Sequence, residues 1–317
     1  IIYNIRVKKM ETNQIVTIFG AGFIGRYVVR HLDRKGFRSI VLSRKPFSKN
    51  HILTQGRTGY VDLLKFNPSE IKRAIEKSDY VINLTGTLLE KDFFKIHSDL
   101  PELISKLCAE NKKIKKLIHV SACGASKNSK SAYQQSKYLG EERVLNNFSS
   151  SVIIRPSLVV GAEDSFTNLW GKLSFSPIIP LVGSKFRFQP IWVNCLAQAI
   201  VNALDKTENE GKIYEIGGDK IFSFQDLVKL ILRIIGKKRI IFDIPVSQGK
   251  ILGTVLQLFP GKPILTKDQC VILSEKDNVV SDKHLKINDL GISPADIEKK
   301  MSDWLVQYRK FGQFTKV

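Results

Sequence analysis

Tyr133 and Lys137 are spaced four residues apart, so both side chains project from one face if the segment is helical. A phenol with a pKa of about 10 is a poor base at neutral pH. A neighbouring ammonium group favours the phenolate and lowers that pKa. Ser121 stands twelve residues before Tyr133, at the end of an apolar run, where a hydroxyl can bind a substrate oxygen. These three residues are predicted to form a proton-transfer site.

A glycine-rich segment, GAGFIG (20–25), follows the first apolar run and matches the pattern G-x-G-x-x-G. Gly20 permits a tight turn, Gly22 lets the backbone approach a pyrophosphate, and Gly25 lets a helix pack closely on the strand. The helix that starts near Phe23 presents free N–H groups and its positive dipole end to phosphates. Strand, glycine loop and amphipathic helix together predict dinucleotide binding. The contacts are expected from Gly20, Gly22, Phe23, Ile24, Gly25 and Arg26.

The end of the second apolar run distinguishes two cofactors. An NAD site usually has an acid here, about 20 residues after the glycines, to bind the ribose 2′-hydroxyl. This chain has Ser43, Arg44 and Lys45 instead. A guanidinium grips a 2′-phosphate, which a carboxylate would repel. NADPH is therefore predicted, with NAD(H) the less favoured cofactor, and Arg26 as a second charge near the phosphate.

Further cofactor contacts are expected where later strands end. Asp62 and Leu63 follow the third strand and are predicted to meet the adenine. Asn83, Thr85 and Gly86 end the fourth strand beside the cofactor. Lys137 is expected to hold the ribose hydroxyls as well as to assist Tyr133.

Apolar runs rich in β-branched residues alternate with segments of helical period, a rhythm typical of βαβ units and a parallel sheet. Six such runs predict a doubly wound Rossmann sheet. The predicted strands are 15–19, 39–43, 58–61, 80–84, 116–121 and 151–156, and the predicted helices are 23–35, 69–77, 94–111 and 132–147.

The rhythm loosens after about residue 160, which indicates a smaller, mostly helical C-terminal lobe. The predicted organisation is an N-terminal extension (1–13), a Rossmann domain (14–164) and the smaller lobe (165–317), with 191–218 returning to the Rossmann sheet. Ser223, Thr266 and the Ser293–Asp296 segment are expected to begin helices of this lobe.

The motifs GAGFIG, NLTG (83–86), HVSACGAS (119–126), YQQSK (133–137) and RPSLVVG (155–161) resemble those of the short-chain dehydrogenase/reductases, of the extended or atypical type. The resemblance covers about residues 15–161. It implies Tyr133 as the acid/base, Lys137 as its partner and ribose clamp, Ser121 as the substrate-oxygen donor, and Pro156 and Ser157 near the carboxamide.

This chain departs from that family at two places. Its glycine loop is shorter than the usual G-x-x-G-x-x-G, and Ser121-Ala122 replaces a usual pair of hydroxyl residues. Ser126 is therefore an alternative to Ser121, and turnover stays an open question.

The segments GRYVVRHL (25–32), QPIWVNCLAQAIVNAL (189–204) and PILTKDQ (263–269) are similar to those of the Rossmann-type accessory subunits of respiratory complex I and their bacterial relatives. This second resemblance spans most of the chain. It implies tightly held NADPH, often without turnover, and proximity to quinone chemistry at a membrane. The implied location is the mitochondrial matrix or bacterial cytoplasm, peripheral on the inner membrane.

Composition excludes several other classes of protein. The 50 Lys and Arg against 30 Asp and Glu give a net charge of +20, which favours anionic partners. The four cysteines lie far apart and the five histidines have no metal-ligand spacing, so neither a disulfide framework nor a metal site is predicted. No apolar run reaches the 18 residues of a transmembrane helix.

Two main hypotheses follow. The first is a NADPH-binding protein of the respiratory-chain type, docked to complex subunits or to quinone or lipid at a membrane. The second is a free-standing NADP-dependent reductase, epimerase or isomerase acting on a small or lipid-like substrate. Nucleic acid is an unlikely partner, because the charge alone suggests it and no recognition motif is present. The apolar stretches 227–236 and 251–259 are candidates for a lipid-facing surface or for core helices.

Overall fold

A computed structural model of the chain describes residues 13–43, 57–60, 67–88, 90–259, 263–310 and 312. Within these residues seven strands form one parallel sheet in the order β11-β6-β5-β4-β1-β2-β3. The strands are β1 (Ile15–Phe19), β2 (Arg38–Ser43), β3 (Arg57–Tyr60), β4 (Tyr80–Asn83), β5 (Lys116–Val120), β6 (Ser151–Pro156) and β11 (Ile213–Ile216). The six predicted strands are therefore present, and β11 extends the sheet beyond β6.

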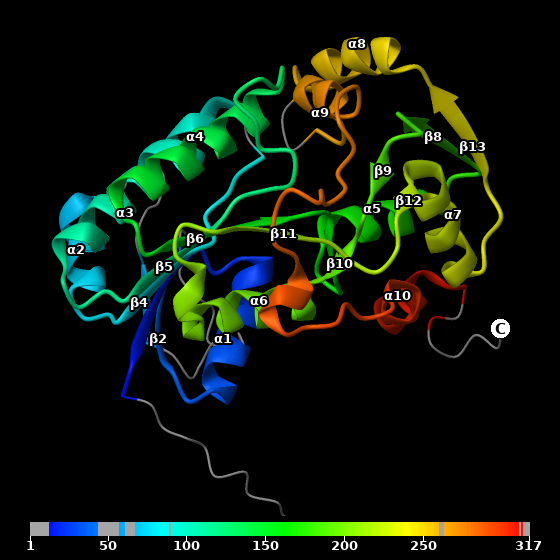
Figure 1. The fold of residues 1–317 in the computed structure, drawn as a ribbon. Coiled ribbons are helices and arrows are strands. Elements are labelled where there is room, and N and C mark those ends of the chain that lie inside the picture. The colour runs from blue at the N-terminus through cyan, green and yellow to red at the C-terminus, as the bar shows by residue number, and fades with distance from the viewer. Residues whose placement is uncertain are drawn as a thin grey trace, which may run out of the picture.

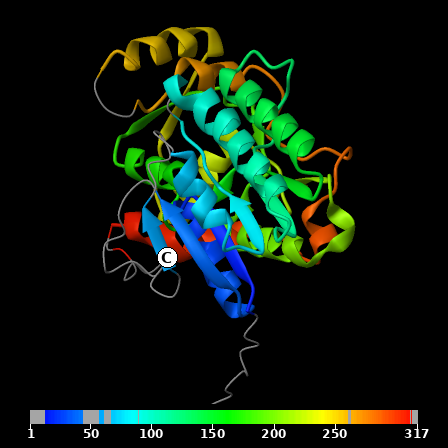
Figure 2. The ribbon, with the colours of Figure 1, turned by 90° about the vertical axis from the view of Figure 1, so that its left-hand side faces the viewer.

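Helices cover both faces of this sheet. One face carries α2 (Pro68–Ile75), α3 (Leu100–Glu110) and α4 (Ala132–Asn147), and the other carries α1 (Phe23–Arg34) and α6 (Val193–Asp205) (Figures 1 and 2). A turn of π-helix (Lys95–Asp99) leads directly into α3. This is the predicted doubly wound Rossmann arrangement.

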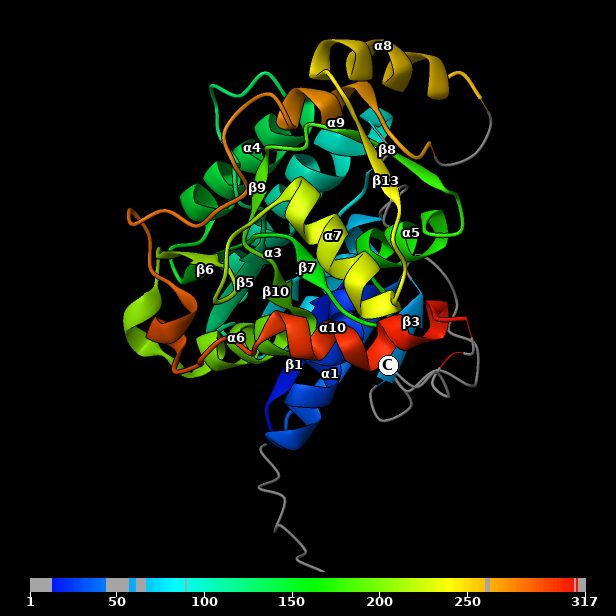
Figure 3. The same cartoon turned by 90° about the vertical axis from the view of Figure 1, so that its right-hand side faces the viewer.

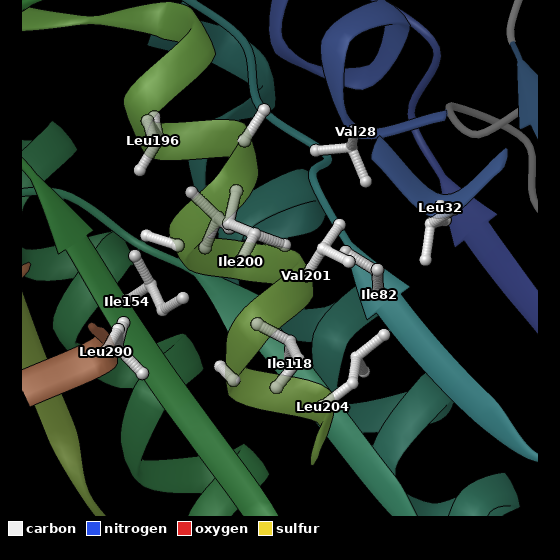
Figure 4. Close-up of a cluster of buried hydrophobic side chains, with 14 of the residues drawn as sticks. Val28, Leu32, Ile82, Ile118, Ile154, Leu196, Ile200, Val201, Leu204 and Leu290 are labelled. Carbon is white, nitrogen blue, oxygen red and sulfur yellow. The ribbon is translucent and has the colours of Figure 1, made fainter. Parts of the chain in front are cut away.

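The two faces are buried because the central strands β1, β4, β5 and β6 are buried almost throughout. On the face of α1 and α6, Ile82, Ile118 and Ile154 of three neighbouring strands contact Ile200 and other α6 residues (Figure 4). On the opposite face, Val81, Leu117 and Ile153 pack against α2, α3 and α4. Adjacent residues of one strand thus enter different cores, as the two-residue period of a strand requires.

A buried ion pair joins α4 to the sheet. The Arg155 guanidinium at the end of β6 donates to both carboxylate oxygens of Glu141, at 2.8 and 2.5 Å. Glu215 of β11 lies 3.5 Å from the same guanidinium. All three side chains are nearly inaccessible to solvent, so the pair is satisfied only if α4, β6 and β11 keep this spacing.

The described residues that follow β6, apart from α6 and β11, form a smaller lobe in which helices predominate. It contains α5 (Ser165–Leu173), α7 (Phe224–Ile235), α8 (Val246–Leu256), α9 (Lys267–Ile272) and α10 (Ile297–Leu305). Three two-stranded ribbons accompany them: β7 (Val159–Val160) with β10 (Ile191–Trp192), β9 (Arg187–Phe188) with β12 (Phe222–Ser223), and β8 (Ile178–Val182) with β13 (Ile240–Ile244).

The helix-start predictions for this lobe are confirmed at two of three places. Ser223 caps α7, and Thr266 with Gln269 forms a complete capping box on α9. The third prediction needs correction, because Asp296 caps α10 and Ser293 does not. The Asp296 carboxylate accepts hydrogen bonds from the amides of Glu298 and Lys299.

The stretches 227–236 and 251–259 have different environments. Leu227, Val228 and Ile231 of α7 are fully buried against α5 and α10, so the first stretch is a core helix. Ile251, Leu258 and other large residues of the second stretch are exposed.

Candidate functional site

The glycine loop lies at the carboxyl end of β1, between β4 and β2, where the strand order reverses direction. Gly20 has φ +101°, and a Cβ there would lie 3.0 Å from the carbonyl of Leu84. A Cβ at Gly25 would lie 2.4 Å from the carbonyl oxygen of Gly20, so α1 approaches the loop too closely for a side chain. A Cβ at Gly22 would meet nothing within 4 Å. The open space at Gly22 is a cradle that a ligand can enter.

The first turn of α1 has the electrostatics of an anion site. It carries no acidic residue, and its N-cap residue is a glycine, Gly22, which has no side chain to cap the first amides. Phe23, Ile24 and Arg26 are partly buried in this turn. The positive end of the helix dipole therefore faces the loop without a neutralising carboxylate.

Four predicted contacts cannot be located. Arg44, Asp62 and Leu63 lie outside the described residues, and Ser43 is described only as the last backbone position of β2. The choice between NADPH and NADH depends on these residues and remains a prediction.

Asn83, Thr85 and Gly86 form an ordered turn after β4. The Asn83 Oδ1 accepts hydrogen bonds from the Thr85 amide at 3.0 Å and the Thr85 hydroxyl at 2.6 Å. Gly86 is close to Lys137, since a Cβ on Gly86 would lie 3.9 Å from the Lys137 Nζ. The turn after β4 and the lysine predicted to bind ribose are thus brought together.

Lys137 is buried on α4 and directed at the end of β5. Its Nζ donates a hydrogen bond of 3.3 Å to the carbonyl oxygen of Val120, the residue before Ser121. Burial lowers the pKa of Lys137 to about 8, although the Glu141 carboxylate opposes this shift. Lys137 and Ser121 are therefore neighbours at the carboxyl edge of the sheet.

The two candidate serines differ in their bonding. The Ser121 hydroxyl is buried and finds no hydrogen-bond partner among the described residues, which is costly unless a ligand provides one. The Ser126 hydroxyl instead accepts a hydrogen bond from the Asn128 amide at 3.2 Å. Ser121 is the serine with unused bonding capacity.

Tyr133 lies in the first turn of α4, in edge contact with the rings of Phe93 and His97 at centroid distances of 5.5 and 5.2 Å. Burial, together with the Asp268 carboxylate, raises the pKa of Tyr133 to about 12. This shift is opposite to the one expected from Lys137 alone. Desolvation disfavours the phenolate, and the charge that adds to the shift, the Asp268 carboxylate, is negative. The lowering expected from Lys137 together with a bound nicotinamide ring stays a prediction.

Ser157 and Pro156 support the site from β6. The Ser157 hydroxyl lies 2.7 Å from the backbone oxygen of Asn278 and 2.7 Å from its side-chain oxygen. The Pro156 carbonyl accepts a hydrogen bond from the Cys123 amide at 2.9 Å. Ser157 thus ties a C-terminal segment to the end of β6.

Two buried histidines next to Lys137 escaped the sequence analysis. The His97 Nε2 accepts from the Thr87 amide at 3.1 Å, so its Nδ1 carries the proton and donates to the Ser136 hydroxyl at 3.0 Å. The His119 Nδ1 accepts from the Asn83 amide group at 3.1 Å. The proton of His119 is then on Nε2, which is buried and has no partner in the part of the chain that the structure describes. No metal-like spacing marks either residue in the sequence.

Both imidazoles are neutral at physiological pH. Burial, assisted by the Lys137 charge, lowers the pKa of His97 to about 2 and that of His119 to about 3. A neutral His97 keeps the Thr87 amide and the Ser136 hydroxyl in fixed positions on either side of it. It therefore connects the turn after β4 to the helix that carries Tyr133 and Lys137.

The residues at the start of α4 are hydrogen-bonded to two carboxylates of the smaller lobe. The sequence analysis did not predict these two carboxylates. Asp268 accepts from the Ala132 amide at 2.8 Å and the Ser131 hydroxyl at 2.7 Å. Glu275 accepts from the Lys130 amide and the Ser129 hydroxyl, both at 2.6 Å. We call these four bonds the carboxylate clasp. The partners are more than 130 residues apart in the chain, so no local pattern reveals them.

Within the described part of the chain, no group of three or more His, Cys, Asp or Glu side chains is arranged to bind a metal ion. None of the helices described there is long and apolar enough to cross a bilayer.

Comparison with known proteins agrees with this geometry. The model of the NAD dependent epimerase/dehydratase family matches residues 16–217. The mitochondrial NADH dehydrogenase [ubiquinone] 1 alpha subcomplex subunit 9 of Arabidopsis thaliana is 33% identical over 94% of this chain and 79% of its own length. A ceramide reductase of Caulobacter vibrioides is 28% identical over 60% of this chain and 61% of its own.

Solved structures show the same fold at lower identity. A UDP-glucose 4-epimerase from Thermotoga maritima, solved with UDP-glucose, superposes with a TM-score of 0.69 at 17% identity. The superposition covers 94% of this chain and 99% of the epimerase chain.

Gly22→Val and Gly25→Ala should separate binding from folding. Valine at position 22 fills the open space that a pyrophosphate needs, so dinucleotide affinity should fall by about 100-fold or more, roughly 3 kcal/mol, while the melting temperature is kept. Alanine at position 25 meets the Gly20 carbonyl and should destabilise the fold by about 1–3 kcal/mol. Calorimetry and thermal melting measure the two effects. Undiminished binding by a folded Gly22→Val protein would contradict the loop assignment.

The buried histidines should make the fold sensitive to mild acid. Their folded pKa values lie below the unfolded value of about 6.5, so the stabilisation is present above that pH and is lost as pH falls. Each imidazole should remove about 2 kcal/mol of unfolding free energy between pH 7 and pH 5. Urea titrations at both pH values measure the loss, and His97→Gln should show about 2 kcal/mol less of it. A histidine NMR titration with a midpoint near 6.5 for either ring in the folded protein would refute the assignment.

Proposed function

This chain belongs to the NAD dependent epimerase/dehydratase family and is homologous to subunit 9 of the complex I alpha subcomplex. We therefore propose that it is an accessory subunit of a respiratory NADH-ubiquinone oxidoreductase and that it holds NADPH. In this role the nucleotide is held tightly as a structural or sensing group. The observation that carries the proposal is the open glycine loop where the strand order reverses, in a chain that is similar to that subunit over 94% of its length.

The residues around the loop fit a dinucleotide. Gly22 and the first turn of α1 would hold the pyrophosphate, and Lys137 would hold the ribose hydroxyls next to Gly86. Ser121 offers a buried hydroxyl without a partner at the same sheet edge. When bound, the nicotinamide supplies a hydride acceptor or donor.

The proton-transfer half of the site supports holding over turnover. General acid–base catalysis is most efficient when the pKa of the group lies near the working pH. The phenol of Tyr133 is about five pKa units above neutrality, because it is desolvated and faces the Asp268 carboxylate. At neutral pH a phenol with this pKa is a poor general acid, and its phenolate form is scarcely populated.

The choice of NADPH rests on the sequence at the end of β2. Ser43 and Arg44 occupy the position where an acid would bind the 2′-hydroxyl of NAD. Arg26, in the first turn of α1, adds a positive charge near the expected 2′-phosphate. NAD(H) remains the less favoured ligand.

The relatives that carry the subunit name are mitochondrial, and this chain is similar to them over nearly its whole length. We place it on the matrix side of the inner membrane, or the bacterial cytoplasmic side, peripheral to the bilayer and attached to other complex subunits. Quinone or lipid at that surface belongs to the same proposal.

A second function is favoured by one observation. The unpartnered Ser121 hydroxyl is what a reductase would direct at a substrate oxygen, and the ceramide reductase relative is an enzyme by name. The alternative is a free-standing NADP-dependent reductase, epimerase or isomerase of a small or lipid-like substrate, with Tyr133 and Lys137 catalytic.

Arg44→Ala tests the cofactor. Loss of a charge-assisted bond to the 2′-phosphate should weaken NADPH by about 1.5–3 kcal/mol and leave NADH nearly unchanged. Titration calorimetry with both nucleotides measures this, and Arg34→Ala, at the exposed end of α1, is the matched control. Equal affinity of the unmodified protein for NADPH and NADH would contradict the cofactor proposal.

Tyr133→Phe tests subunit against enzyme. Removing the phenol oxygen from an enzyme should lower turnover by about 10²–10⁴-fold, whereas a nucleotide-holding subunit should keep its assembly and its quinone reduction. We expect the second result, and we expect Gly22→Val to impair assembly. The measurements are native gels and NADH:quinone activity of membranes from cells that carry each variant. Normal assembly together with lost NADPH-dependent conversion of a metabolite in Tyr133→Phe cells would favour the enzyme instead.

A further inference from the structure

Helix α8 packs on the protein in an unusual orientation. Its buried residues are two glycines, Gly249 and Gly253. A Cβ at Gly249 would lie 2.4 Å from a Val182 methyl group, and a Cβ at Gly253 would lie 2.7 Å from the Thr266 backbone. The glycines therefore form the inward face and let the helix lie close against β8 and α9.

The large apolar residues of α8 are consequently on its outer side. Ile251 is 69% exposed, and Leu258 and Phe259, just after the helix, are 80% and 65% exposed. Leu252, Val255 and Ile264 are exposed as well. A helix that contributes to a core has the opposite arrangement, with its large apolar residues inward.

The neighbouring ribbon of β8 and β13 continues this surface. Its inward residues Ile179 and Leu181 are buried, as is usual. On the outward face, the cross-strand partners Ile178 and Ile240 are 51% and 68% exposed. The next outward pair is Pro180 and Phe242, with Phe242 60% exposed.

These residues form one outer edge of the molecule. Helix α8 and the ribbon of β8 and β13 lie next to each other at the end far from α1 (Figures 1 and 3). We call this surface the apolar edge, and it consists of Ile178, Ile240, Phe242, Ile251, Leu252, Val255, Leu258, Phe259 and Ile264. So many large exposed apolar residues on adjacent elements indicate an interaction surface.

The charge of the same segment indicates what it contacts. Residues 227–267 contain eight Lys and Arg and a single acid, Asp243. Lys237 lies over the exposed ring of Phe175 at 3.5 Å, so a cation accompanies the apolar side chains directly. Apolar residues flanked by Lys and Arg are the composition of a surface that inserts shallowly among anionic headgroups.

We propose that the apolar edge, with its flanking lysines and arginines, docks on the surface of a bilayer that contains anionic phospholipid. Apolar side chains of α8 and β13 enter the boundary between headgroups and acyl chains, while Lys238, Lys250 and Lys267 attract the phosphates. The inference deepens the peripheral membrane location under the proposed function. It stands on different residues from the nucleotide site.

Sedimentation with vesicles tests the inference using the purified full-length protein. The vesicles consist of phosphatidylcholine with about 30% cardiolipin as the anionic lipid. We expect the protein to bind them, and we expect its partitioning to fall about tenfold or more when the cardiolipin is replaced by phosphatidylcholine. The triple variant Ile251→Ser, Leu258→Ser, Phe259→Ser should lose about 100-fold in partitioning. The triple variant Lys238→Gln, Lys250→Gln, Lys267→Gln should lose about 100-fold.

Ile221→Ser is the matched control, because Ile221 is 50% exposed but lies outside the apolar edge, and it should bind like the unmodified protein. Thermal melting verifies that each variant is folded. Absence of binding to anionic vesicles, or binding that survives the serine substitutions, overturns the inference and assigns the edge to a protein partner instead. Vesicle binding requires neither nucleotide nor complex, so this test can fail while the nucleotide proposal holds, and the reverse.

Discussion

The contact between Gly25 and the carbonyl oxygen of Gly20 sets the geometry on which the rest of the site depends. A Cβ would lie 2.4 Å from that oxygen, so α1 can approach β1 this closely only with glycine present. The approach brings the first turn of α1 to the sheet edge and leaves the space at Gly22 open. The turn after β4 lies against Gly20 from the other side, through Leu84. Loop, helix dipole and neighbouring strand end therefore converge on one place.

Helix α4 meets a different requirement, because its inward face is polar. Gln134, Ser136, Lys137 and Glu141 are all buried there. Burial of such groups is tolerated only when each finds a partner. Ser136 pairs with His97, Lys137 with the Val120 carbonyl and Glu141 with Arg155. The helix is thereby fixed in both rotation and depth, which is what positions Tyr133 and Lys137.

These features also explain how far the sequence could be interpreted. Strands and most helices follow local apolar period and capping chemistry, so the six strands and the caps at Ser223 and Thr266 were predictable. The tight turn at Gly20 follows from its place in the glycine-rich motif after β1. His97, His119, Asp268 and Glu275 were missed because their partners are distant in sequence. Hydrophobicity did not distinguish 227–236 from 251–259 either, since only packing shows that α8 turns its glycines inward.

The carboxylate clasp changes what the beginning of α4 can do. The first amides of a helix usually lack partners within the helix and depend on local caps or water, and helix ends fray readily. Here the amides of Lys130 and Ala132 are bonded to Glu275 and Asp268 of the other lobe. Hydrogen exchange at these two amides therefore reports the separation of two lobes and not the fraying of a helix end. The amides just before Tyr133 therefore lose their carboxylate partners when those lobes part.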